Sequence, residues 1–110
     1  MHLFARLRDA RHFERTHLGE LKKLEDFDLV REIGYHQELG APLRMKTLYL
    51  LDLGSVATIQ RRVRRLKRLG LIVQKKSAHD GRALELLLNP RLFKVIARYA
   101  EILAVKRKRI

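Results

Sequence analysis

The strongest chemical signal in the sequence is a run of cations between Gln60 and Arg68, where six of nine residues are Lys or Arg. Small polar side chains, Ser55 and Thr58, precede it. A run of positive charges without negative ones favours binding to a polyanion, because its cations neutralise phosphates. The amide of Gln60 can pair with adenine through two hydrogen bonds, and an arginine can pair with guanine in the same way. The run therefore indicates contact with nucleic acid, and a solvated helix face is the alternative.

The position of each side chain along this helix predicts its role. Small or amide side chains near the start let a helix approach base edges closely, which favours Ser55, Thr58 and Gln60 as base-proximal residues. Later arginines are better placed for phosphates, which position a protein without reading sequence. The predicted phosphate contacts are Arg62, Arg64, Arg65 and Arg68.

A second basic feature is the turn His79-Asp80-Gly81-Arg82. With His79 and Arg82 at its tip, this turn can reach a neighbouring minor groove, where narrow A·T tracts attract arginine. We expect Asp80 to hold Arg82 by a local ion pair. The alternative is an ordinary Asp-Gly hairpin turn with Arg82 solvated.

Catalytic and metal-binding patterns do not stand out. The pair His12 and His17 is a weak ligand spacing, and His36 is better explained as partly buried structure. The sequence has no cysteine, so it has no disulfide and no thiol ligand. Asp26 and Asp28 are typical of a helix start, with Asp26 as N-cap. We therefore predict no enzyme, no catalytic residue, no metal site and no cofactor.

Length and composition bound the class of protein. The chain has 110 residues, 25 Lys and Arg against 12 Asp and Glu, a net charge of +13, and 46% hydrophobic residues. This fits one domain and excludes a disordered basic tail. No apolar run approaches ~18 residues, so we expect no membrane span, and no secretory signal is visible. We also expect no membrane partner, because the most basic helix uses its apolar stripe for a core instead of a membrane surface. Missing cysteines fit a reducing cytoplasm, with nucleoid association expected from the charge.

Glycine, proline and capping residues divide the chain into predicted elements. The predicted helices are 2–24, 27–39, 45–52, 56–69 and a last one that begins at Pro90 after the cap Asn89. The first of them has a possible kink over 9–17. The predicted strands are 71–76 and 82–88, joined by a turn at 77–81. Helix 56–69 begins after the N-cap Ser55 and ends at Gly70. Its core stripe is Ile59, Val63 and Leu66, with Leu69 as a further candidate.

This order of elements predicts a mainly α fold with a small β-hairpin (α+β), a winged helix-turn-helix with N- and C-terminal helices extending from the core. We expect residues 26–89 to form the DNA-binding domain. Residues 1–25 and 90–110 are then helical extensions for dimerisation, because their apolar residues exceed what one small core buries. The alternative is that these helices fold back on each other.

Two segments resemble the MarR-type transcription regulators. The first is Ser55 to Arg61 followed by Leu66 and Leu69-Gly70-Leu71-Ile72, and the second is Asp80-Gly81-Arg82-Ala83 with Leu86 and Leu88 beyond. The likeness covers about residues 26–92. It implies a homodimer with interlocked terminal helices on a pseudo-palindromic operator. It also implies Ser55, Thr58, Gln60 and Arg61 near bases and Arg82 in the minor groove.

The predicted function is a DNA-binding transcriptional regulator acting on double-stranded DNA as a homodimer. A plasmid or phage replication or partition factor, or a non-specific architectural protein, is the alternative that the arginine density favours. A winged helix used for protein–protein contact is a third. The tail Lys106–Arg109 is either a phosphate-contacting extension or a solvated helix end. The sequence does not indicate a small-molecule effector.

Overall fold

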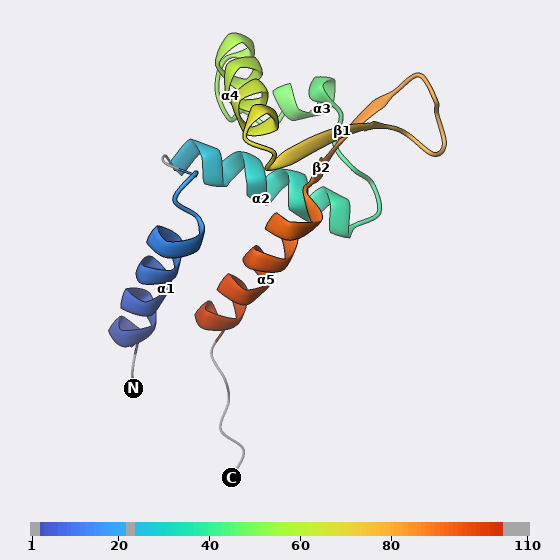
Figure 1. Cartoon of the computed structure of the whole chain (residues 1–110). Helices are drawn as coiled ribbons and strands as arrows, with labels where there is room; N and C mark the ends of the chain where they lie inside the picture. Colours follow the sequence, from blue (N-terminus) through green and yellow to red (C-terminus); the bar gives the residue numbers. More distant parts are fainter. Residues whose placement is uncertain (1–2, 22–23, 105–110) are drawn as a thin grey trace.

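The computed structural model describes residues 3–21 and 24–104 (Figure 1). The elements in chain order are α1 (Leu3–His17), α2 (Leu24–Glu38), α3 (Met45–Tyr49), α4 (Val56–Arg68), β1 (Ile72–Lys76), β2 (Leu84–Leu88) and α5 (Pro90–Leu103). The tail Lys106–Arg109 lies outside the described residues.

Helices α2, α3 and α4 and the β-hairpin form a head, and α1 and α5 extend from it side by side (Figure 1). The two long helices run in opposite directions, so the start of α1 and the end of α5 lie together, away from the head. This is the predicted winged helix-turn-helix with helical extensions. None of the helices in the described ranges is long and apolar enough to cross a membrane.

The core of the head collects one apolar face from each element. Its fully buried side chains include Leu29 and Ile33 of α2, Leu48 of α3, Leu66 of α4 and Leu86 of β2. The predicted stripe of helix α4 is confirmed, since Ile59 and Val63 are buried beside Leu66. Leu69 is 42% exposed, because α4 ends at Arg68 and Leu69 is already its C-cap.

Helix α4 begins and ends as its local sequence predicts. The Oγ of Ser55 accepts a 3.2 Å hydrogen bond from the backbone N–H of Thr58, which satisfies one of the free donors of the first turn. Gly70 has a φ of +76°, a left-handed conformation that glycine adopts without strain after a helix. Asn89 and Pro90 likewise start α5, where Asn89 Oδ1 accepts from the Arg91 N–H at 2.8 Å.

The two strands pair in antiparallel register from Ile72 with Leu88 to Lys76 with Leu84. The connecting loop, residues 77–83, is longer than the predicted turn at 77–81. The Ser77 N–H donates to the Ala83 carbonyl at 2.8 Å, which closes the loop, and the buried Ser77 Oγ accepts hydrogen bonds from the N–H groups of His79 at 3.1 Å and Asp80 at 3.2 Å. We call β1, loop 77–83 and β2 the wing. The segment 41–44 adds to its edge through a 2.7 Å bond from Leu86 N–H to the Leu43 carbonyl.

The prediction of one N-terminal helix over 2–24 is wrong. Helix α1 ends at His17, and residues 18–21 form a non-helical connection that buries Leu18 and Leu21 in the core. The chain has to turn here to bring both leucines inward. Helix α2 then begins at Leu24 instead of 27, so Asp26 is not the N-cap but a buried residue of the first turn. Helix α3 ends at Tyr49, three residues earlier than predicted.

Candidate nucleic-acid interface

Helix α4 presents its cations along one exposed stripe. Ile59, Val63 and Leu66 face the core, and the opposite side carries Gln60, Arg61, Arg64 and Arg68, all exposed. Residues 60, 64 and 68 follow one another at i, i+4 spacing, so their side chains line up along the helix. Among the described residues, none of these four side chains forms a hydrogen bond or ion pair. We call this set the exposed stripe.

The two small polar residues at the start of α4 are bonded to each other. Besides capping the helix, the Ser55 hydroxyl donates to Thr58 Oγ1 at 2.9 Å. Ser55 is therefore occupied on both sides, whereas the hydroxyl hydrogen of Thr58 is left to donate outward. Of the two, Thr58 is the one whose hydroxyl can also bond to a partner without losing the cap.

Arg62 and Arg65 have intramolecular partners, in contrast to the exposed stripe. Arg65 Nη1 donates to Asp26 Oδ2 at 2.7 Å, and its Nη2 donates to the carbonyl oxygen of Glu20 at 3.0 Å. Arg62 Nη2 lies 4.0 Å from Glu25 Oε1. Both guanidinium groups face the first turn of α2. Spacing within α4 does not reveal this, because the acidic partners lie more than 30 residues away in sequence.

The wing carries exposed basic side chains at its loop and along β1. His79 and Arg82 are exposed in the loop, and Lys75 and Lys76 are exposed at the end of β1. The predicted ion pair between Asp80 and Arg82 is wrong. Asp80 Oδ1 accepts instead from the backbone N–H of Arg82 at 3.1 Å, and its Oδ2 lies 3.9 Å from Arg44 Nη1.

Sequence reasoning missed three basic residues beside the predicted site. Arg44 precedes α3 and lies next to the wing loop, and the two lysines of β1 extend the basic surface from that loop toward the sheet. Their positive charge was the available signal. The two lysines directly precede the loop in the sequence, whereas the proximity of Arg44 depends on a tertiary contact with Asp80 that the sequence did not reveal.

Helices α1 and α5 are held together by aromatic and polar contacts. The rings of Phe13 and Tyr99 stack at 5.9 Å, and the guanidinium of Arg98 lies 5.3 Å from the Phe13 ring centre. Tyr99 also donates to Glu14 Oε2 at 2.6 Å. Burial and this bond raise the pKa of Tyr99 to about 12. The two helices therefore pack on each other, as one of the predicted alternatives required.

Substantial apolar surface of the two helices remains outside these contacts. Leu3, Phe4 and Leu7 of α1 and Leu103 of α5 are all exposed. They belong to the first turns of α1 and the last turn of α5, and the start of α1 and the end of α5 lie farthest from the head (Figure 1). At the same end the guanidinium of Arg6 donates to the carbonyl oxygens of Ile102 and Ala104. The contacts between α1 and α5 therefore bury one face of the helix pair and leave another face exposed.

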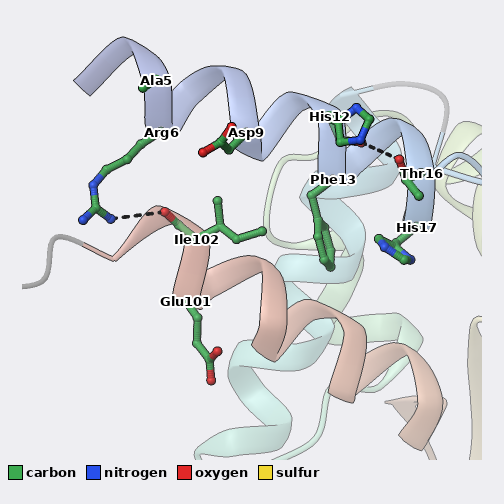
Figure 2. A pocket seen from close by; sticks show the side chains of 9 residues that line it. All are labelled: Ala5, Arg6, Asp9, His12, Phe13, Thr16, His17, Glu101 and Ile102. Carbon is green, nitrogen blue, oxygen red and sulfur yellow. Dashed lines mark hydrogen bonds between the residues drawn. The ribbon is translucent and has the colours of Figure 1, made fainter. Parts of the chain in front are cut away.

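An open depression of about 620 Å³ lies between α1 and the C-terminal part of α5 (Figure 2). Arg6, Asp9, His12, His17 and Glu101 are among the side chains that line it. The weak histidine pair of the sequence thus lies at one surface, but within residues 3–21 and 24–104 no three His, Cys, Asp or Glu side chains form a metal-binding group. His36 is partly buried, with Nδ1 2.9 Å from the Glu32 carbonyl oxygen, which confirms its structural interpretation.

Comparison with solved structures finds the same fold in other proteins. No protein-family model matches the sequence, and no curated protein matches it significantly. Among solved structures, transcriptional regulator Tm0710 from Thermotoga maritima superposes with a TM-score of 0.63 at 23% identity, over 89% of this chain and 64% of that one. This chain thus spans less than two thirds of Tm0710.

Two further structures have the same arrangement. MarR superposes with a TM-score of 0.54 at 23% identity, over 92% of this chain and 77% of the MarR chain. A mutant of MepR from S. aureus, bound to an oligodeoxyribonucleotide, superposes with a TM-score of 0.60 at 17% identity, over 94% of this chain and 76% of the MepR chain. The chain therefore has the winged-helix fold of MarR-type regulators, which confirms the predicted fold class.

Proposed function

We propose that this protein is a DNA-binding transcriptional regulator that acts as a homodimer, with α4 in the major groove and the wing along the minor groove. The observation that carries the proposal is the exposed stripe. It consists of three arginines and one glutamine on the second helix of a helix-turn-helix, directed away from the core. That the MepR neighbour is bound to an oligodeoxyribonucleotide supports the same use of the fold here.

Within the stripe, position along α4 separates base contacts from backbone contacts. Gln60 and Arg61 lie nearer the N-terminal end of α4, the end that helix-turn-helix proteins direct at base edges. Arg64 and Arg68 lie further along and suit phosphates. Thr58 joins the base-proximal set through its remaining hydroxyl hydrogen, and Ser55 contributes by capping the helix end.

The wing supplies the minor-groove contact. Arg82 and His79 extend from a loop whose backbone is held by Ser77 and Asp80, so their side chains start from an ordered base. A narrow A·T-rich groove attracts arginine through its enhanced negative potential. Lys75 and Lys76 add phosphate contacts along the same edge.

Dimerisation rests on the open apolar face of the helix pair, where Leu3, Phe4, Leu7 and Leu103 are exposed. A second copy related by two-fold symmetry covers this face and gives each dimer two copies of α4. Two such helices read half-sites about one helical turn, roughly 34–36 Å, apart. Residues 26–89 are then the DNA-binding unit, and the helices on either side are the dimerisation unit. The proposal needs no metal or cofactor, and it places the protein in the cytoplasm with the nucleoid.

The arginine density of α4 favours one competing function, a non-specific architectural protein or a replication or partition factor. Selection of binding sites from random DNA, with the mass in solution measured alongside, separates the two. A symmetric enriched motif with a dimer mass is expected for the regulator. Salt-sensitive binding that enriches no motif supports the architectural function, and no salt-sensitive DNA binding overturns both and favours a protein–protein role.

A further inference from the structure

The carboxylate of Asp26 is the most deeply buried charge in the described part of the chain. Asp26 is 2% exposed, and Ser77 is the other buried polar residue there. A buried carboxylate is strongly unfavourable unless it is paired. Its partner is Arg65 of α4, with a 2.7 Å charge-assisted bond between Nη1 and Oδ2. The pair therefore has to stay closed for Asp26 to remain buried.

The same guanidinium reaches a second segment. Arg65 Nη2 donates to the Glu20 carbonyl at 3.0 Å, within residues 18–21 that connect α1 to α2. One side chain of α4 thus joins the first turn of α2 and the end of the preceding connection. Because the guanidinium is planar and its two terminal nitrogens are bonded to different segments, its orientation is fixed.

The position of Arg65 on α4 makes this bond relevant to the exposed stripe. At 100° per residue, residues 58, 62 and 65 lie on the flank between the buried stripe and the exposed stripe. Arg62 on the same flank faces Glu25. Arg61 is one turn from Arg65, so a bond that holds Arg65 also limits rotation of the stripe about the helix axis.

We infer that Arg65 and Asp26 are positioning residues, which hold α4 against the α1–α2 connection and so orient the exposed stripe, and that Arg65 does not neutralise a phosphate. We call the bonds of Arg65 to Asp26 and to the Glu20 carbonyl the brace. The inference rests on the proposed DNA-binding function, but the brace is present in the protein without DNA. A phosphate that drew Arg65 away from Asp26 would leave the Asp26 carboxylate buried and unpaired, which disfavours that contact.

Three variants test this. Asp26→Asn combined with Arg65→Gln removes both charges of the brace and leaves the net charge unchanged. Arg64→Gln is the matched control, a neighbouring arginine on the exposed stripe. Arg65→Lys keeps the cation but loses the planar fork. Two measurements are made on each: the slope of log affinity for DNA against log salt, and amide hydrogen exchange of the free protein.

For Arg64→Gln we expect a slope smaller by about 0.9, equivalent to roughly a 3.5-fold change between 50 and 200 mM salt, with exchange unchanged. For the double variant we expect the wild-type slope, faster exchange in residues 18–21 and 56–68, unchanged exchange in the wing, and a weaker preference for the selected site. A double variant that loses the same slope as Arg64→Gln, with exchange unchanged, makes Arg65 a phosphate contact and overturns the inference.

Arg65→Lys keeps the test decisive if the double variant does not fold. One ammonium cannot reproduce both bonds in the same plane, so we expect faster exchange in residues 18–21 at an unchanged salt slope. Wild-type exchange in this variant overturns the brace. If the wild-type protein shows no salt-dependent DNA binding, the proposed function fails, and the exchange measurements still decide whether Arg65 and Asp26 hold α4.

Discussion

The hydroxyl of Tyr99 donates a 2.6 Å hydrogen bond to Oε2 of Glu14, which joins α5 to α1 between residues 85 positions apart. The same tyrosine ring stacks on Phe13 of α1. Polar and aromatic contacts thus meet at one place on the helix pair, where they keep the two extensions together.

Tyr99→Phe should destabilise the protein by about 1.5 kcal/mol, the lower end for a hydrogen bond to a charged group, because Tyr99 is only partly buried. Urea unfolding measures this. Tyr35→Phe is the control, since Tyr35 is 58% exposed and a surface change should stay within about 0.5 kcal/mol. Equal effects of the two variants would show that the bond to Glu14 contributes nothing.

The raised pKa of Tyr99 predicts a pH dependence at the alkaline end. Burial and the bond to Glu14 raise this pKa from 10.0 to about 12, so folding favours the protonated hydroxyl. The stabilisation is complete below pH 10 and disappears as pH rises toward 12. Wild type should therefore lose stability relative to Tyr99→Phe across that interval. A constant difference between the two proteins would contradict the shift.

Ser55→Ala should lower stability by about 1 kcal/mol, because it removes the N-cap of α4. Thermal unfolding gives the value. Ser55→Asp is the informative companion: its carboxylate can still cap the helix, so stability is kept, but its negative charge should weaken DNA binding. If Ser55→Ala unfolds like wild type, the cap seen in the structure is not contributing to stability.

Gln60→Ala and Arg61→Ala should each weaken binding to the selected site by about 1–3 kcal/mol and change binding to random DNA much less. Arg64→Ala, the control on the same stripe, should weaken both by similar factors, because a phosphate contact does not read sequence. Competition binding with labelled selected and random duplexes measures the ratio. Equal losses on both DNAs for Gln60→Ala would remove its base-reading role.

Arg82→Ala should weaken binding most to sites whose flanking minor groove is A·T-rich, because narrow grooves attract arginine. Lys75→Ala serves as control and should weaken A·T-flanked and G·C-flanked sites alike. The measurement is affinity for matched duplexes that differ only in the flanks. No flank dependence in the wild-type protein would place the wing loop on phosphates alone.

Phe4→Ser should weaken the homodimer more than tenfold, since burying a phenylalanine contributes about 1.5–3 kcal/mol and each dimer contains two. Leu50→Ser is a matched control, because Leu50 and Phe4 are both 79% exposed but Leu50 lies in the head beside α3. Sedimentation equilibrium measures the dissociation constants. A dimer weakened by Leu50→Ser and not by Phe4→Ser would move the interface to the head.

Features that depend on near neighbours in the chain were predictable. The stripe Ile59, Val63 and Leu66, the cap at Ser55 and the left-handed Gly70 all follow from side chains within about four residues of each other. The same holds for the start of α5 at Asn89 and Pro90. Together with the order of elements, these local signals were enough to predict the winged-helix fold.

Errors arose where distant segments decide the outcome. Periodicity alone carried the first predicted helix through residues 18–21, but the core takes up Leu18 and Leu21 and ends α1 at His17. The sequence likewise offered no reason to separate Arg65 from Arg64. Asp80 also has a partner from a distant segment, Arg44, and not the side chain of its neighbour Arg82.

Local sequence alone predicts that α4 is a capped, amphipathic and strongly basic helix, because helix periodicity and capping depend on near neighbours. Which of its arginines are available to a partner depends on contacts between distant segments. Arg61, Arg64 and Arg68 are exposed, whereas Arg65 is bonded to Asp26 and to the Glu20 carbonyl. The reason is physical: a buried carboxylate requires a cation, and which cation reaches it depends on how α2 packs against α4.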